Sequence, residues 1–180
     1  MDKMKIGIIL GSTREGRLSP QVGDWVLGIA KERSDADFEI VDLRDYPLPF
    51  FGEQGNQEAI ARWNQKLAEF DGFIFIVQEY NHSITGVLKN ALDSARDAWA
   101  NKAAGIVSYG SLGGARAAEH LRGILGELQI ADVRTHPALS LFHDFENMSV
   151  FKPQAMQKDT VKQMLDQLLS WTKALKSIRK

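Results

Sequence analysis

The first stretch of this sequence that could do chemistry is the polar loop 11–17, which directly follows the apolar run 6–10. It combines glycines, hydroxyl side chains and arginines: Gly11, Ser12, Thr13, Arg14, Glu15, Gly16 and Arg17. The short apolar run is typical of a strand buried in a parallel sheet, and Ser19-Pro20 predicts the N-cap and first position of a helix. Backbone N–H groups and positive charge at a helix N-terminus bind phosphate. The alternative is an ordinary strand-to-helix turn with solvated arginines.

Two further polar loops follow apolar runs in the same way. Gln78, Glu79, Tyr80, Asn81, His82 and Ser83 come after the run 73–77. The third loop starts at Ser108, at the end of the run 103–108, and continues through Tyr109. Its glycines at 110, 113 and 114 would let backbone N–H groups approach a flat hydrogen-bonding group closely.

The chain alternates between short apolar runs and amphipathic helical patterns, and the strand–helix unit occurs five times. The remaining two strands are expected at 38–43, which alternates like an edge strand, and from 130 to 134. This alternation predicts one α/β domain over residues 1–180, a doubly wound five-stranded parallel sheet of order 2-1-3-4-5 with helices on both faces. The winding reverses between strands 1 and 3, so the three polar loops should converge on one crevice at their carboxyl ends.

The loops lack the sequence features of the commonest nucleotide sites. No Gly-Lys-Ser/Thr ends the first loop, which excludes a P-loop, and no G-x-G-x-x-G opens the first helix. A monophosphate-sized anion at the first loop therefore fits best, with a flat group between residues 79–81 and 108–114.

Composition excludes several other function classes. A net charge of −1 gives no electrostatic reason to expect nucleic acid or a membrane as partner. With no cysteine there is no disulfide and no thiolate chemistry. His120, His136 and His143 lack a metal-ligand spacing, so no metal site is expected. No signal segment precedes the first strand and no apolar stretch has the length of a membrane span, so we expect a cytoplasmic protein.

Four motifs together resemble one known family. Gly11-Ser12-Thr13-Arg14, Glu79-Tyr80-Asn81-His82-Ser83, residues 86–93 (Gly-Val-Leu-Lys-Asn-Ala-Leu-Asp) and Gly113-Gly114-Ala115-Arg116 occur in that order, each after the expected strand. The chain from residue 4 to about residue 152 resembles the NAD(P)H-dependent FMN reductases, the flavodoxin-like group that includes quinone, azo-dye and chromate reductases.

The resemblance implies which residues bind FMN. Ser12, Thr13, Arg14 and Arg17 would hold the phosphate, and Glu79, Tyr80 and Asn81 would edge the isoalloxazine and ribityl chain. Gln78, which directly precedes them, belongs to the predicted set as well. The loop beginning at Ser108 would close over the ring, which adds Ser108, Tyr109, Gly110, Gly113 and Gly114. Two positions depart from the family pattern: Gln78 stands where many members carry proline, and Arg17 where some carry serine.

The resemblance also implies hydride transfer from NADPH or NADH through FMN to a small-molecule acceptor, a quinone, an azo compound or similar. The chemistry would take place on the flavin, so no side chain is assigned as acid, base or nucleophile. Two alternatives stay open, a flavodoxin-type electron carrier and a redox sensor with little NAD(P)H turnover. Such carriers tend to be strongly acidic, which the near-zero net charge does not match.

Assembly and three accessory features complete these expectations. We expect a homodimer or homotetramer, with Trp99 and the late aromatic loop 142–151 near the interface. Arg116 either reaches the 2′-phosphate of NADPH or forms a surface salt bridge. The proline-rich loop 45–52 is either a packed surface loop or lines the substrate site or interface.

Overall fold

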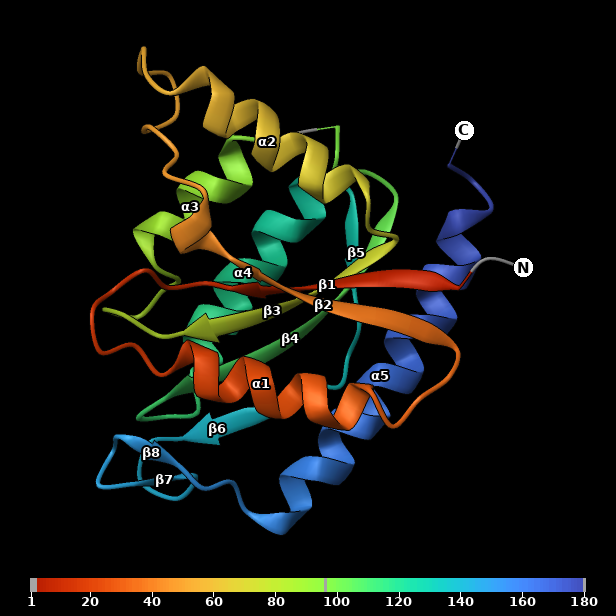
Figure 1. The fold of residues 1–180 in the computed structure, drawn as a ribbon. Coiled ribbons are helices and arrows are strands. Elements are labelled where there is room, and N and C mark those ends of the chain that lie inside the picture. The colour runs from red at the N-terminus through yellow and green to blue at the C-terminus, as the bar shows by residue number, and fades with distance from the viewer. Residues whose placement is uncertain (1–2, 96, 180) are drawn as a thin grey trace.

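A parallel β-sheet runs through the middle of the protein, with helices on both of its faces (Figure 1). The structure is a computed structural model that describes residues 3–95 and 97–179. The strands are β1 (Met4–Leu10), β2 (Ala36–Asp42), β3 (Gly72–Gln78), β4 (Lys102–Gly110), β5 (Ile130–Asp132) and β6 (Ala138–Ser140). Their order is β2-β1-β3-β4-β5, with every pair parallel, which confirms the predicted topology.

The helices divide between the two faces as a doubly wound sheet requires. They are α1 (Ser19–Ala30), α2 (Gln57–Ala68), α3 (Gly86–Asp93), α4 (Ala115–Glu127) and α5 (Ala155–Lys176), with a short 3-10 helix η1 (Leu43–Asp45). In Figure 1, α1 and α5 cover one face, and α2, α3 and α4 cover the other. β3 and β4 are buried along their whole length, whereas β2 alternates, as expected at an edge.

The fifth strand position is divided between two short strands, where the sequence predicted one strand region. β5 pairs with the start of β4 from Lys102, and β6 pairs with its end from Ser108. The segment 133–137 connects the two. Beyond β6, the antiparallel pair β7 (Phe145–Glu146) and β8 (Val150–Phe151) lies on the side of the molecule where the strands end (Figure 1). The predicted loop therefore contains a small hairpin.

Trp99 belongs to the core, so its predicted place at an interface is wrong. Its side chain is fully buried, and its ring packs edge-on against Trp63 and Phe73 with centroids 6.0 and 4.9 Å away. The Trp99 indole N–H donates to the Leu92 carbonyl oxygen at 3.0 Å. A large aromatic side chain with a satisfied N–H gains more by burial than by exposure.

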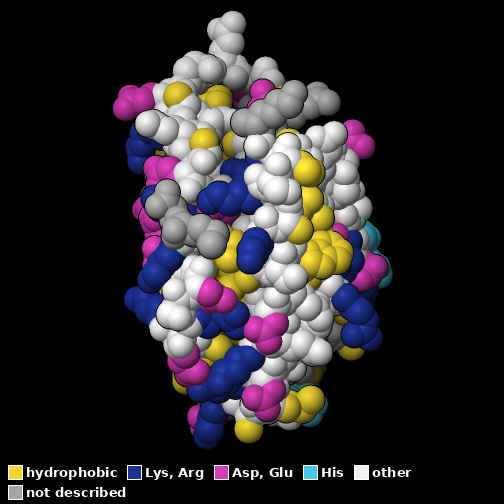
Figure 2. Space-filling model, turned by 90° about the vertical axis from the view of Figure 1, so that its right-hand side faces the viewer, with side chains coloured by type: hydrophobic (Ala, Val, Ile, Leu, Met, Phe, Trp, Pro, Cys, Tyr) yellow, Lys and Arg dark blue, Asp and Glu magenta, His cyan; other side chains and the backbone are white. Residues whose placement is uncertain are grey.

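The end of the molecule opposite the polar loops carries mixed charges. Figure 2 shows lysine and arginine side chains interspersed with acidic ones over this face. Arg33 pairs there with Asp35 at 2.7 Å and with Asp166 at 2.5 Å. Within residues 3–95 and 97–179, no helix has the length and apolar character needed to cross a membrane.

Candidate functional site

The first polar loop begins where β1 ends beside β3. The Gly11 N–H donates to the Ile76 carbonyl oxygen at 3.0 Å. A Cβ atom at position 11 would lie only 2.7 Å from that same oxygen, so only glycine lets the chain lie this close to β3. The loop is thereby held at the point where the winding of the sheet reverses.

Ser12, Thr13 and Arg14 line one cavity of about 340 Å³. The Ser12 side chain is buried and its Oγ accepts a hydrogen bond from the Arg14 N–H at 3.3 Å. The Arg14 side chain is exposed, with its guanidinium carbon 5.6 Å from the centre of the Tyr80 ring. The cavity is completed by Phe50, Tyr80, Thr85, Gly86 and Val87.

Arg17 has a different role from the predicted phosphate contact. Its guanidinium forms a two-pronged pair with Asp42 at the end of β2, with Nη1 to Oδ1 at 2.5 Å, and the side chain is 8% exposed. Nη1 also donates to the Ser12 carbonyl oxygen at 2.6 Å. The hydrogen bonds that Arg17 donates to the Asp42 carboxylate raise the pKa of Arg17. The guanidinium therefore supports the loop from behind and is not free to bind an anion.

The start of α1 also differs from the prediction. Ser19 is the first helical residue and Leu18 the N-cap, and no side chain caps the helix. The Ser19 hydroxyl is fully buried next to the Tyr109 phenol and makes no hydrogen bond of good geometry within the described chain. Ser19 lies in the first turn of α1, where the N–H groups of a helix favour an anion. The loop and helix together therefore fit a phosphate group.

The second polar loop is a tight turn. Tyr80 and Ser83 exchange two backbone hydrogen bonds of 3.0 and 3.1 Å, and Asn81 and His82 between them have φ values of 48° and 73°. Tyr80 and Asn81 are both exposed, and Tyr80 lines the cavity of the first loop. His82 is exposed as well, as part of the turn itself.

The side chains of Gln78 and Glu79 hold neighbouring elements together. Gln78 is buried and its Nε2 donates to the Gly11 carbonyl oxygen, a contact that a proline at this position could not make. The Glu79 carboxylate is 5% exposed and accepts from Arg116 Nε at 2.6 Å and from the Arg116 N–H at 3.2 Å. Glu79 thus turns toward the start of α4, away from the predicted flavin edge, and Arg116 forms a salt bridge.

Ser108, Tyr109 and Gly110 form the end of β4, so they do not belong to a loop that could close over a ring. Ser108 and Tyr109 are buried, and the Tyr109 ring packs 5.8 Å from Phe145. Burial raises the pKa of the Tyr109 phenol. The loop part of the predicted region shrinks to residues 111–114, of which Leu112 is strongly exposed.

The backbone of the third loop is fixed by a buried serine–histidine pair. Ser108 Oγ donates to the Gly113 carbonyl oxygen at 2.5 Å and lies 2.6 Å from His136 Nε2. Because the single hydroxyl proton goes to Gly113, His136 must donate from Nε2. Burial lowers the pKa of His136 to about 4, so the ring is neutral at pH 7.

The neutral His136 predicts an acid-sensitive stability. The His136 ring has a pKa near 6.5 in the unfolded chain and a pKa of about 4 in the native protein, so the unfolded chain is protonated first as the pH falls. The free energy of unfolding is therefore unaffected above pH 6.5 and should fall by about 2–3 kcal/mol between pH 6.5 and 4. Denaturant unfolding of H136Q should show a smaller fall over this interval. The variant H143Q, in an exposed loop, should behave as the parent protein, and an unchanged pH slope in H136Q would contradict the prediction.

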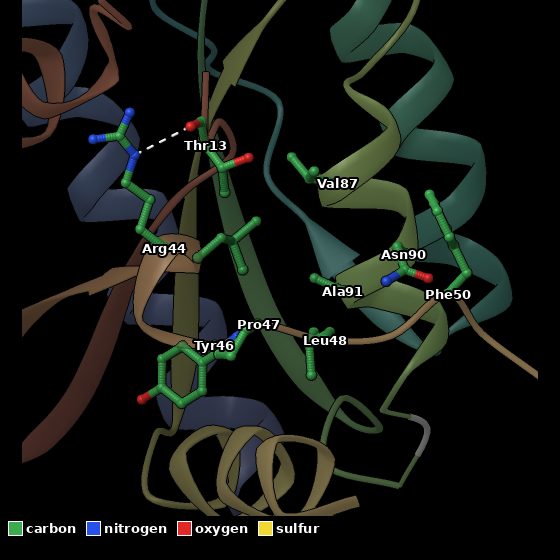
Figure 3. Close-up of a pocket in the computed structure, with 10 residues that line it drawn as sticks. Thr13, Arg44, Tyr46, Pro47, Leu48, Phe50, Val87, Asn90 and Ala91 are labelled. Atoms are coloured by element: carbon green, nitrogen blue, oxygen red, sulfur yellow. Dashed lines mark hydrogen bonds between the residues drawn. The ribbon is translucent and has the colours of Figure 1, made fainter. Parts of the chain in front are cut away.

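A second cavity of about 330 Å³ adjoins the first and shares Thr13, Phe50 and Val87 with it. Figure 3 shows Thr13 and Arg44 on one side of this cavity, Val87, Asn90 and Ala91 of α3 across from them, and the loop through Tyr46, Pro47 and Leu48 below. Part of the loop 45–52 thus lines a cavity. Asn90 holds it, donating to the Pro49 carbonyl oxygen at 2.9 Å and accepting from the Phe51 N–H at 2.8 Å.

The sequence matches the family described as NADPH-dependent FMN reductase over residues 4–144, which includes all three polar loops. The chain belongs to this family. It is 39% identical over 149 residues to an NAD(P)H-dependent FMN reductase of Schizosaccharomyces pombe, covering 78% of this chain and 74% of the other. It is 30% identical over 181 residues to a 2-hydroxy-1,4-benzoquinone reductase of a Burkholderia species, covering 94% and 97%.

Solved structures confirm the flavodoxin-like fold. The flavoenzyme FerB, an NAD(P)H:(acceptor) oxidoreductase from Paracoccus denitrificans, superposes with a TM-score of 0.76 at 20% identity, over 93% of this chain and 98% of its own. As a member of the FMN reductase family, the protein is an oxidoreductase that uses FMN and NAD(P)H, as the resemblance predicted. The donor-rich first loop and the adjoining first turn of α1 fit the phosphate of FMN.

Three residues near the first loop were missed by the sequence analysis: Asp42, Arg44 and Thr85. Thr85 caps α3 by accepting from the Leu88 N–H at 3.1 Å and donates to the Gly11 carbonyl oxygen at 2.6 Å. Arg44 donates to the Thr13 and Arg14 carbonyl oxygens. Asp42 could have been identified from the sequence, because it is a carboxylate at the end of the predicted edge strand. The predicted strand order places that end beside a loop with two arginines.

Proposed function

We propose that this FMN reductase transfers reducing equivalents from NAD(P)H to quinones at the carboxyl edge of its sheet. The observation that carries the choice of acceptor is the match to a 2-hydroxy-1,4-benzoquinone reductase over nearly the whole of both chains. A quinone reductase of Escherichia coli is also 30% identical, over 69% of this chain and 70% of its own. The names of both relatives give a quinone, a small planar molecule, as the acceptor.

Ser12, Thr13 and Arg14 would hold the FMN phosphate in this proposal, and Tyr80 and Asn81 would edge the isoalloxazine. When bound, FMN supplies the hydride-accepting and electron-donating chemistry. The protein contributes orientation: the Tyr80–Ser83 turn and the Ser108–Gly113 hydrogen bond fix the backbone on either side of the ring position. Gly113 and Gly114, in left-handed conformations, would present their backbone to the ring.

The second cavity offers a place for the acceptor beside the flavin position. Its walls are mainly apolar, from Leu43, Pro47, Leu48, Phe50, Val87 and Ala91, and the side chains with polar atoms are Thr13, Arg44, Tyr46 and Asn90. Mostly apolar pockets with a few polar groups bind flat ring compounds. Since Thr13 and Val87 line both this cavity and the proposed phosphate site, an acceptor there would lie next to the flavin.

The absorbance spectrum of the purified protein tests this proposal. The FMN-loaded protein should bleach within seconds of adding NADPH or NADH without oxygen, and 1,4-benzoquinone should restore the oxidised spectrum. Initial rates should give parallel double-reciprocal lines, because donor and acceptor would use the same open face in turn. A flavin that stays oxidised would favour a carrier or sensor. Rapid bleaching with recovery by azo dyes but not by quinones would overturn the choice of acceptor.

The proposal extends to assembly and location. We infer a homodimer or homotetramer, supported by exposed apolar side chains around the site: Phe50, Phe51, Val87, Leu112 and Phe142. Light scattering at micromolar concentration tests this, and a monomer would contradict it. A cytoplasmic location is supported by the absence of cysteine, which is compatible with a reducing compartment.

A further inference from the structure

We propose that Asp42, acting through Arg17 and Arg44, is a positioning residue that holds the first loop ready for phosphate. The inference rests on the proposed role of this loop in binding the FMN phosphate. It assigns the two arginines to the rear of the loop and leaves Arg14 as the arginine that contacts the ligand.

Four consecutive backbone carbonyl groups of the loop are taken up by side chains. The Gly11 oxygen accepts from Gln78 and from Thr85. The Ser12 oxygen accepts from Arg17 Nη1 at 2.6 Å. The Thr13 and Arg14 oxygens accept from Arg44 Nε at 3.1 Å and Nη2 at 2.8 Å, and Figure 3 shows the first of these two contacts.

These contacts determine what the loop can offer a ligand. In a trans peptide the carbonyl group and the following N–H group point in opposite directions, and the peptides here are trans. Occupying the carbonyl oxygens of residues 11–14 thus directs the next N–H groups away from the clamping side chains. Among the described hydrogen bonds, none uses the N–H groups of Ser12, Thr13 or Glu15. The backbone N–H groups of the loop are therefore available to a ligand, whereas its carbonyl oxygens are already hydrogen-bonded. Such a loop can bind an anion but not a cation.

Asp42 joins the two arginine contacts. Its carboxylate pairs with the Arg17 guanidinium, and its Oδ1 accepts from the Arg44 N–H at 3.0 Å, which starts η1. The Arg17 guanidinium belongs to the loop itself and folds back on it, whereas the Arg44 guanidinium reaches the loop from η1. The Asp42 carboxylate at the end of β2 pairs with the first and fixes the start of the helix that carries the second. A charge-assisted two-pronged pair is geometrically specific, so the Arg17 fork can hold the Ser12 carbonyl in one orientation. Preorganised donors bind without reordering cost.

The test compares the affinities of FMN and riboflavin, which differ by the phosphate. The variants D42N and R44M should bind FMN about tenfold more weakly and bind riboflavin as the parent does, because only the phosphate loop is loosened. R44K should lose nearly as much affinity as R44M, because an ammonium group cannot reach both carbonyl oxygens with a fixed fork. Thermal unfolding of each apo variant shows that it is folded.

The matched control is D35N, which breaks the exposed two-pronged Arg33–Asp35 pair at the far end of α1. It should leave both flavin affinities unchanged. Equal losses of FMN and riboflavin in D42N and R44M, or FMN affinities within twofold of the parent, would overturn the proposal. If R44K binds FMN as tightly as the parent protein, Arg44 contributes only its charge, and this result would also overturn the proposal.

The same measurements separate this inference from the proposed phosphate site. If the parent protein binds FMN and riboflavin equally, the loop does not hold the phosphate and both proposals fail. If the parent prefers FMN and the variants keep that preference, the phosphate site stands and only the positioning role of Asp42 and Arg44 is wrong.

Discussion

Replacing Arg14 with alanine is expected to weaken FMN binding about thirtyfold and to leave riboflavin binding within a few-fold of the parent protein. Arg14 lines the proposed phosphate cavity, and its exposed guanidinium forms no ion pair with a described carboxylate. Arg17 is paired with Asp42, and Arg44 is bound to carbonyl oxygens. Arg14 is therefore the first-loop arginine that can meet the phosphate charge, and fluorescence titration with both flavins measures its contribution.

The chain provides a close control for this prediction. The Arg62 guanidinium also lies 5.6 Å from an aromatic ring, that of Tyr46, but on α2 and away from the loop. R62A should not change either flavin affinity. Comparable losses of FMN and riboflavin in R14A would mean that Arg14 acts through its stacking on Tyr80, and unchanged FMN affinity would remove Arg14 from the phosphate site.

Most of the fold could be predicted because buried strands and amphipathic helices follow directly from the spacing of apolar residues. The runs 6–10, 73–77 and 103–108 are buried on both faces, and that pattern has few structural alternatives. The division of the fifth strand position was not predictable in the same way. β5 and β6 are each three residues long, too short for a clear period, and they exist because β4 offers them an edge.

The location of the candidate site could be predicted, but the direction of its side chains could not. Topology alone brings the three loops together. Whether Arg17 and Glu79 face a ligand depends on partners distant in sequence, Asp42 and Arg116, which the loop motifs do not contain. Charged side chains near a site can bind a ligand or hold the backbone that does. Here Arg17, Glu79 and Ser108 hold the backbone. Residue type alone does not distinguish this role from ligand binding, so the sequence analysis assigned all three to the ligand.

The largest stability effect is expected at Gly114, the N-cap of α4. Its φ of 72° is left-handed, and a Cβ there would lie 2.8 Å from both the backbone N and O of Tyr109. Tyr109 cannot move aside, because it is in register with Gln78 on one side and Leu139 on the other. G114A should therefore lose about 3 kcal/mol or more of unfolding free energy, from the left-handed strain together with the overpacking.

G16A separates the two causes of this loss. Gly16 has almost the same φ, 67°, but a Cβ there would meet nothing within 4 Å. Denaturant unfolding of the apo protein should show a loss of about 1 kcal/mol for G16A, the left-handed strain alone. Equal losses in the two variants would mean that β4 and the α4 N-terminus can separate without cost. The larger loss in G114A would show that the third loop is packed directly on β4, so that the backbone proposed to face the flavin is held by the sheet itself.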